Sequence, residues 1–152
     1  MNSTRFIPFE RENSVAGLQS RIGNKLLETQ WINPMPPFSL RPYERLRHSK
    51  DFVRVRKHST HYRTAHFRVN CASNGFTIHR LGMVVQKRFW NAVQRNRIKR
   101  CLREFFRLHK HLIAPPPRDI VIIAMPGAER LSAKEVAFEI LAALEKEKKR
   151  TP

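Results

Sequence analysis

The sequence predicts a small α/β (α+β) two-layer sandwich with the element order α-β-β-α-β-α. Three observations indicate this fold. Residues 80–87 read as a strand with three inward apolar residues, and residues 119–124 are apolar after the first position, as buried strands are. Between them, residues 91–110 follow the helical period, with an apolar face opposite a basic one. A second amphipathic pattern, over residues 132–147, comes near the end of the chain.

The N-terminal quarter differs in composition from the rest. Residues 1–40 hold four Lys or Arg and three Glu, and the segment 33–37 (Asn-Pro-Met-Pro-Pro) interrupts any regular structure. We therefore predict a mostly disordered extension over residues 1–40 and one domain over residues 41–150. The three acidic residues of the extension, Glu10, Glu12 and Glu28, disfavour a mitochondrial transit peptide.

The first predicted helix covers Lys50–His58. Ser49 is a suitable N-cap for it, and Phe52 and Val55 fall on one face of the segment. That face can pack on a sheet. Phe52 could equally present its ring to a nucleic-acid base.

An alternating run predicts the first strand, Tyr62–Cys71. Its core-facing positions are Ala65, Phe67, Val69 and Cys71. Its outward positions are His66, Arg68 and Asn70. This outward face is either an ordinary solvated strand face or a shallow surface that receives a single strand. Ser73-Asn74-Gly75 predicts a turn, and Arg80–Lys87 predicts the second strand, with Leu81, Met83 and Val85 inward.

The central helix is the most informative segment. Asn91 is its expected N-cap, and it must end before the three prolines 115–117. Its predicted apolar face is Ile98, Cys101, Leu102, Phe105 and Leu108. Its predicted basic face is Arg95, Asn96, Lys99, Arg100, Arg103, Arg107 and Lys110. Like charges four residues apart destabilise an isolated helix, so this face is best explained by a polyanionic partner.

The last two elements are a strand and a helix. Asp119–Ala124 reads as a buried central strand. Ser132 and Glu135 form a capping box for a helix that reaches about Glu147. The apolar positions of that helix are Val136, Phe138, Ile140, Leu141 and Leu144.

Charge indicates the class of partner. The chain carries a formal charge of +18 and has a sequence pI near 11.3, which points to nucleic acid, with an anionic membrane surface as the alternative. The sequence has no apolar run long enough to span a bilayer and no signal-peptide h-region. Cys71 and Cys101 occupy core-type positions, which predicts free buried thiols, a reducing compartment and a cytoplasmic monomer.

The residues do not predict a catalytic or metal site. The seven histidines show no paired ligand spacing on one element, and the acidic residues are scattered rather than clustered as a two-metal nuclease requires. There is no Gly-rich phosphate loop and no Ser/His/Asp set. The sequence therefore predicts a binding protein rather than a catalyst.

Two adjoining blocks, residues 80–88 (Arg-Leu-Gly-Met-Val-Val-Gln-Lys-Arg) and 91–107, which contains Arg95-Asn96-Arg97, closely resemble the bacterial ribonuclease P protein family. Residues 45–47, 50–52, 119–124 and 126–127 support the resemblance, which covers about residues 42–147. It implies a left-handed βαβ crossover, against the usual right-handed rule. It also implies one protein bound to a large catalytic RNA that cuts the 5′ leader from precursor tRNA, with Mg²⁺ held mainly by that RNA.

The resemblance assigns two binding surfaces. Residues implied to bind the catalytic RNA are Lys87, Arg88, Arg95, Asn96, Arg97, Lys99, Arg100 and Arg103. Residues implied to line a cleft for the leader strand are Phe52, Arg56, Arg68 and Asn70. No catalytic residue and no metal ligand is implied in the protein.

The chain departs from the family at three positions. Trp90 stands where the family often has Gly, Arg56 where an aromatic residue is common, and Asn70 where Tyr is frequent. The leader cleft should therefore be more basic and rely less on stacking. Two rival classes are a plain RNA-binding or ribosome-associated protein and a nuclease in its own right.

Overall fold

The computed structural model describes residues 39–150, with Arg150 by its backbone alone. The predicted disordered extension of residues 1–40 therefore lies outside the described residues, apart from Ser39 and Leu40. The main elements are α2 (Ser49–His58), β1 (Thr60–Arg63), β2 (Phe67–Ser73), β3 (Arg80–Val84), α3 (Ala92–His109), β4 (Arg118–Ala124) and α4 (Ala133–Arg150). Short 3₁₀ helices are η1 (Pro42–Glu44), η2 (Lys110–Leu112) and η3 (Ala128–Arg130).

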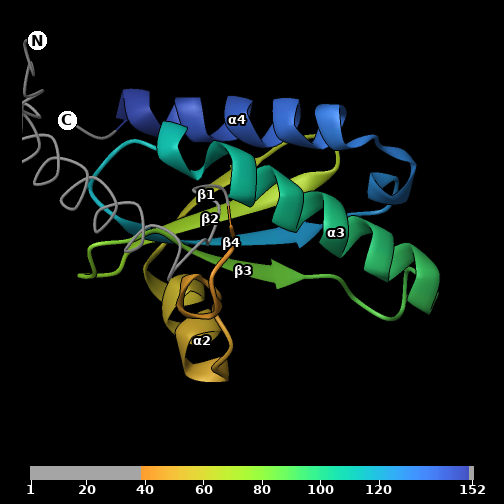
Figure 1. Ribbon diagram of the computed structural model, residues 1–152, viewed down its shortest axis with the longest axis horizontal. Helices are drawn as coiled ribbons and strands as arrows, with labels where there is room; N and C mark the ends of the chain where they lie inside the picture. The colour runs from red at the N-terminus through yellow and green to blue at the C-terminus, as the bar shows by residue number, and fades with distance from the viewer. Residues whose placement is uncertain (1–38, 151–152) are drawn as a thin grey trace, which may run out of the picture. The chain divides into compact units, whose positions relative to one another are not determined.

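Four strands form one mixed sheet in the order β1-β2-β4-β3. The β1–β2 and β2–β4 pairs are antiparallel, whereas β3 and β4 are parallel neighbours joined through α3. Helices α3 and α4 lie side by side over one face of the sheet, and α2 packs on the opposite face (Figure 1). This arrangement confirms the predicted α+β class.

The main core lies between the sheet and the pair α3 and α4. It includes fully buried side chains from the sheet and from both helices, among them Phe67, Leu102, Phe106, Ile122 and Ile140. A smaller cluster beneath α2 contains Leu46, Val55, Ala72 and Val121. Because β4 is covered on both faces, it is apolar nearly throughout, as the sequence predicted.

Both long helices begin with the predicted caps. The Asn91 side chain accepts from the Gln94 backbone N–H (2.9 Å), and the Asn91 N–H donates to the Gln94 side chain (3.1 Å). The same reciprocal pair joins Ser132 and Glu135. Helix α2 differs, because His48 rather than Ser49 is its N-cap and Ser49 is its first residue.

The predicted single strand over residues 62–71 is wrong, because the segment is the hairpin β1–β2. Its turn contains neither Gly nor Pro. Instead, the Thr64 hydroxyl accepts from the Phe67 N–H (3.0 Å), and the Thr64 N–H donates to the Phe67 carbonyl (2.8 Å). Ala65 therefore lies in an exposed turn and not in the core. The second predicted strand is shorter than expected: it ends at Val84, opposite Ile123, where pairing with β4 stops.

Two positions predicted to be apolar core residues are exposed. Leu108 is 36% exposed and Phe138 is 75% exposed. Leu108 lies at the margin of the apolar stripe of α3, whereas Phe138 lies on the side of α4 opposite the buried residues Val136 and Ile140. Phe106, which was not predicted as a core position, is fully buried instead.

Candidate nucleic-acid interface

Helix α3 exposes basic side chains to solvent because its opposite, apolar face is buried in the core. Ile98, Leu102, Phe105 and Phe106 are each at most 2% exposed. At 3.6 residues per turn, the side chains half a turn away must face solvent. The exposed members of the predicted RNA-binding set on this helix are Asn96, Arg97, Arg100 and Arg103, whereas Arg95 and Lys99 are partly buried.

Carboxylates neutralise the positive charge of α3 only near its C-terminal end. Arg107 donates through Nε and Nη2 to the two carboxylate oxygens of Glu104 (3.0 and 2.6 Å), and Lys110 Nζ lies 2.5 Å from Glu44. The hydrogen bonds from Arg107 hold the pKa of Glu104 below its usual value. The predicted free basic face thus ends before Arg107. Arg97, Arg100 and Arg103 make no ion pair with any carboxylate of residues 39–150.

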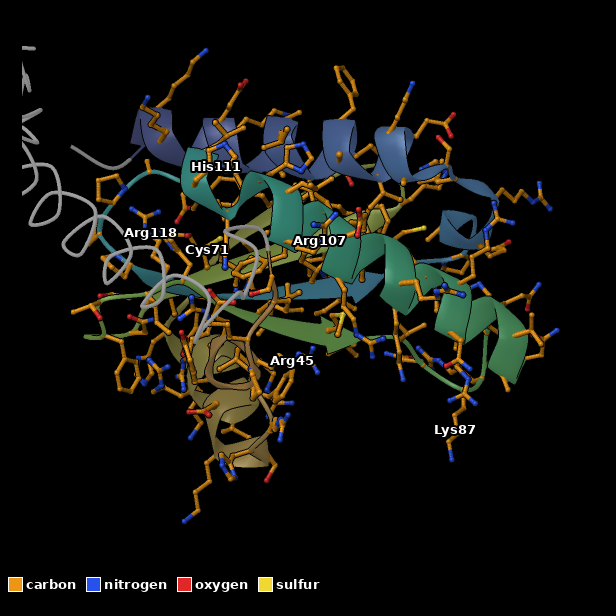
Figure 2. The ribbon with its side chains drawn as sticks, viewed as in Figure 1. Arg45, Cys71, Lys87, Arg107, His111 and Arg118 are labelled. Carbon is orange, nitrogen blue, oxygen red and sulfur yellow. The ribbon has the colours of Figure 1, made fainter. Side chains whose placement is uncertain are left out.

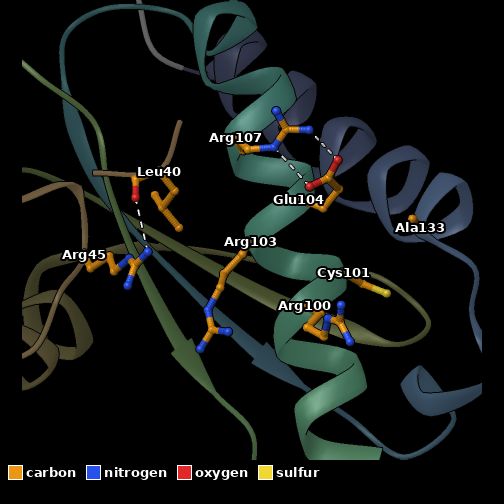
Figure 3. Close-up of a pocket in the computed structure, with 8 residues that line it drawn as sticks. All are labelled: Leu40, Arg45, Arg100, Cys101, Arg103, Glu104, Arg107 and Ala133. Atoms are coloured by element: carbon orange, nitrogen blue, oxygen red, sulfur yellow. Dashed lines mark hydrogen bonds and ion pairs between the residues drawn. The ribbon is translucent and has the colours of Figure 1, made fainter. Parts of the chain in front are cut away.

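A basic hollow of about 530 Å³ lies against this helix (Figure 3). Its lining residues are Leu40, Arg45, Arg100, Cys101, Arg103, Glu104, Arg107 and Ala133. Its lining has four guanidinium groups and one carboxylate, so its net charge is positive. Arginine suits a phosphate ligand because its planar fork pairs with phosphate through two hydrogen bonds.

An apolar cleft of about 260 Å³ lies on the other side of the sheet, between α2 and the strands. Its lining residues are Phe52, Val53, Val55, Arg56, Asn70, Val84, Val121 and Ile123. Three of the four predicted leader-cleft residues, Phe52, Arg56 and Asn70, are therefore brought together. Gly82 makes room for Phe52, because a Cβ at this position would lie 2.9 Å from the Phe52 ring.

Asn70 is the buried polar residue of this cleft. It was predicted to point outward, and it does lie on the α2 face of the sheet, but it is only 4% exposed. Its Oδ1 lies 3.0 Å from Nδ1 of His61, its cross-strand neighbour. Since both Oδ1 and an unprotonated ring nitrogen are acceptors, His61 must donate from Nδ1. The Asn70 carbonyl is therefore occupied.

The fourth predicted cleft residue, Arg68, lies in an adjoining trough. The trough is lined by Arg63, Ala65, Arg68, Gln86, Arg88, Phe89, Ile123, Ala124, Met125 and Pro126. Trough and cleft share Ile123, so they follow one another along the sheet. Arg88, predicted to bind with the α3 residues, lies here beside Arg68 and stacks over the Phe89 ring at 4.5 Å. Lys87 is exposed in the turn before α3 and points away from the sheet (Figure 2).

Trp90 attaches this turn to the body of the protein. It is 6% exposed, and its Nε1 donates to Glu129 at 2.7 Å. Phe89 packs edge-on against it, with ring centroids 5.6 Å apart. The bulky residue at this position therefore has a structural partner, which the sequence pattern alone did not indicate.

Sequence reasoning missed a buried ion cluster beneath α2. Asp119 is fully buried and accepts hydrogen bonds from Arg80, Arg54 and Asn74. Its bonds to Arg80 raise the pKa of that guanidinium, and Asp51 lies 3.5 Å away from the same group. The only available signal was an aspartate at the start of an otherwise apolar strand. The cluster fixes α2, and with it one wall of the cleft, against the sheet.

Cys71 and Cys101 are free thiols, and burial raises the pKa of the Cys71 thiol, which makes it unreactive. Among residues 39–150, no three His, Cys, Asp or Glu side chains lie close enough together to hold a metal ion. None of the helices in that range has the length and apolar character needed to cross a bilayer.

Known proteins are similar to this chain in both sequence and fold. The family model described as Ribonuclease P matches residues 40–148. A relative from Syntrophobacter fumaroxidans, named ribonuclease P protein component, is 59% identical over 102 residues, which is 67% of this chain and 86% of the relative. The solved RNase P protein of Thermotoga maritima aligns with a TM-score of 0.61 and 34% identity, covering 67% of this chain and 96% of that one. The Staphylococcus aureus RNase P protein gives a TM-score of 0.63 and 32% identity, covering 69% and 95%.

Proposed function

The chain belongs to the ribonuclease P protein family, and from that premise we propose which RNA each of its two surfaces binds. As a member, it is the protein subunit of the ribonucleoprotein that cuts precursor tRNA to give the mature 5′ end. In bacteria the RNA of this particle is the catalyst. The proposal concerns which residues hold which RNA.

The exposed face of α3 binds the catalytic RNA. The observation that carries this assignment is the run of arginines Arg97, Arg100 and Arg103, which no carboxylate of residues 39–150 neutralises. Phosphate groups would supply the missing anions, and Asn96 can bond a sugar or a base edge. The full proposed set on this surface is Lys87, Arg95, Asn96, Arg97, Lys99, Arg100 and Arg103. Arg88, which the sequence grouped with them, lies in the trough beside Arg68.

The cleft under α2 and the adjoining trough receive the 5′ leader of precursor tRNA. Their apolar floor suits the faces of unpaired bases, and the basic residues at their edges, Arg56 and Arg68, suit the phosphates. Because cleft and trough share Ile123, one strand can run through both. The trough ends beside Arg88, just before α3, so the leader strand would leave the protein next to the RNA-binding helix.

The protein contributes binding and the RNA contributes the reaction. The described residues hold no cluster of acids suited to Mg²⁺, so we assign this ion mainly to the RNA. We also propose one protein per RNA and a cytoplasmic particle. Two free thiols, one of them buried, support a reducing compartment.

Reconstitution tests this function. Purified protein, precursor tRNA and Mg²⁺ are incubated with and without bacterial ribonuclease P RNA, and the RNA is also assayed without the protein. We expect cleavage at the mature 5′ end only when the RNA is present, and faster cleavage with protein than without it. Cleavage by the protein alone would contradict the proposal and favour a protein nuclease.

A further inference from the structure

A fourth hollow carries aromatic and basic side chains that neither proposed surface uses. It has a volume of about 340 Å³ and lies between the segment that precedes α2, the β2–β3 loop and the start of β3. That volume is within the range of about 300–1,000 Å³ typical of small-ligand sites. We call it the aromatic hollow, after Tyr43 and Phe76, which both contribute to its lining.

The two aromatic rings are exposed and held by cations. Tyr43 is 54% exposed and Phe76 is 55% exposed. The guanidinium of Arg80 lies 4.6 Å from the centroid of the Phe76 ring, and that of Arg41 lies 5.8 Å from the Tyr43 centroid. Arg80 lies over the Phe76 ring, whereas Arg41 reaches Tyr43 at its hydroxyl, donating from Nη1 at 2.5 Å. Each ring thus has one cationic neighbour that fixes its orientation. Exposed, oriented rings are what unpaired bases stack on.

The hollow also presents unneutralised positive charge. Arg47 is exposed and forms no ion pair with a carboxylate of residues 39–150, and the His48 side chain is exposed beside it. The Nε of Arg45 is buried and has no hydrogen-bond acceptor within that range. Asp51, the one acid in the lining, is engaged by Arg80. Rings together with free cations suit a ligand with both a base and a phosphate.

We propose that the aromatic hollow binds an unpaired nucleotide of the catalytic RNA. The inference rests on the proposed function, because it uses the RNA-binding role of α3. Arg45 lines both this hollow and the basic hollow against α3, so the two form one continuous basic surface. The cleft proposed for the leader shares no lining residue with it. The occupant is therefore a strand of the RNA bound by α3 and not the leader.

Salt-dependent binding of the full-length protein to ribonuclease P RNA tests the inference. Tyr43→Ala and Phe76→Ala should each weaken binding by about 5- to 100-fold, the loss expected for one base–aromatic stack. Neither change removes a charge, so the slope of log affinity against log salt should stay that of the wild type. Arg47→Ala should instead lower the slope by about 0.7–0.9, as expected for one lost phosphate contact. Phe138→Ala is the matched control, because Phe138 is a more exposed ring on α4 and should have no effect.

The outcomes separate this inference from the proposed function. If Arg97→Ala weakens binding while Tyr43→Ala and Phe76→Ala behave like Phe138→Ala, the aromatic hollow is no RNA site and only this inference fails. It also fails if the aromatic variants weaken only leader-bearing precursor tRNA. If the aromatic variants lose affinity and Arg97→Ala does not, the hollow is supported and the assignment of α3 falls. Unchanged melting temperatures show that all variants are folded.

Discussion

The guanidinium of Arg80 donates two hydrogen bonds to the carboxylate of Asp119, from Nε to Oδ1 (2.7 Å) and from Nη2 to Oδ2 (2.6 Å). The two residues face each other in the register of the parallel strands β3 and β4. Asp119 also accepts from Arg54 of α2, so one buried carboxylate joins two strands to the helix that forms the cleft wall. The binding surface on this side therefore depends on a group that RNA does not touch.

Asp119→Asn should destabilise the protein strongly. Removing one partner of a buried pair leaves uncompensated charge, which typically costs about 3–5 kcal/mol. Chemical denaturation measures the change in the free energy of unfolding. Asp51→Asn is the control, because Asp51 is partly exposed and its longer contact to Arg80 should contribute less than about 1 kcal/mol. Equal effects of the two substitutions would contradict the role assigned to Asp119.

Phe105→Ala should lower stability without removing an RNA contact. Phe105 is 2% exposed in the main core, and loss of its ring should cost about 3–5 kcal/mol through the cavity that it leaves. Leu108→Ala, one turn further along at 36% exposure, should cost well under half as much. The melting temperatures of the two variants, compared with the wild type, measure this difference. A smaller loss for Phe105→Ala than for Leu108→Ala would show that the faces of α3 are misassigned.

Stability should depend on pH through His79. Burial, reinforced by the charge of Arg118, lowers the pKa of His79 from its usual 6.5, and its Nδ1 accepts the Arg118 backbone N–H at 3.2 Å. The unfolded chain therefore binds a proton more readily. The free energy of unfolding should fall as the pH drops below 6.5 and level off below the folded pKa.

His79→Gln isolates this effect, since glutamine can still accept the Arg118 N–H but does not titrate. Melting temperatures between about pH 5 and 7 should vary less in the variant than in the wild type. The carboxylates with lowered pKa, such as Glu104 and Glu129, lose their contribution only as the pH falls below their usual 4.5, outside that window. Parallel profiles of variant and wild type would exclude His79 as the cause.

Removal of the N-terminal extension should leave the domain intact if the cut respects two backbone contacts. The Ser39 carbonyl accepts from Lys110 (2.9 Å), and the Leu40 carbonyl accepts from Arg45 (3.2 Å). A chain of residues 39–152 should keep the melting temperature and the RNA affinity of the full protein. A chain that begins at Arg41 loses both contacts and should melt slightly lower. A large loss in the first truncation would place part of the extension in the core.

Local signals explain why α3 and α4 were predicted well. Each has a capping pair three residues apart and an apolar stripe of helical period. Both signals come from residues close together in the sequence, so they can be recognised without the fold. The β1–β2 hairpin was missed for the opposite reason. Its turn is closed by the Thr64 hydroxyl, and threonine at such a position is not a specific turn signal.

The site was predictable in part. The free arginines of α3 follow from helical period alone, and Asn70 was correctly placed on the cleft side of the sheet although its burial was not foreseen. The Asp119 cluster could not be predicted, because Arg54, Arg80 and Asp119 are far apart in sequence and meet only once α2 docks. For the same reason, sequence order grouped Arg88 with α3, whereas the fold places it beside Arg68.

The central claim is that α3 holds the catalytic RNA while the cleft and trough hold the leader. Paired variants address it: Arg97→Ala and Arg100→Ala on the helix, Arg68→Ala in the trough, and, as a charge-matched control, Lys146→Ala at an exposed position of α4. Loss of a charge-assisted hydrogen bond predicts that each helix variant weakens catalytic-RNA binding by about 1–2 kcal/mol, with a shallower salt dependence.

The most direct measurement is the affinity of these proteins for ribonuclease P RNA, followed by the affinity of each reconstituted particle for precursor and mature tRNA. We expect Arg68→Ala to bind the catalytic RNA like the wild type and to lose affinity only for the leader-bearing precursor. Arg97→Ala and Arg100→Ala should lose affinity for the catalytic RNA itself, and Lys146→Ala should change neither. An equal loss for precursor and mature tRNA in Arg68→Ala, or wild-type RNA binding in both helix variants, would contradict the division of the two surfaces.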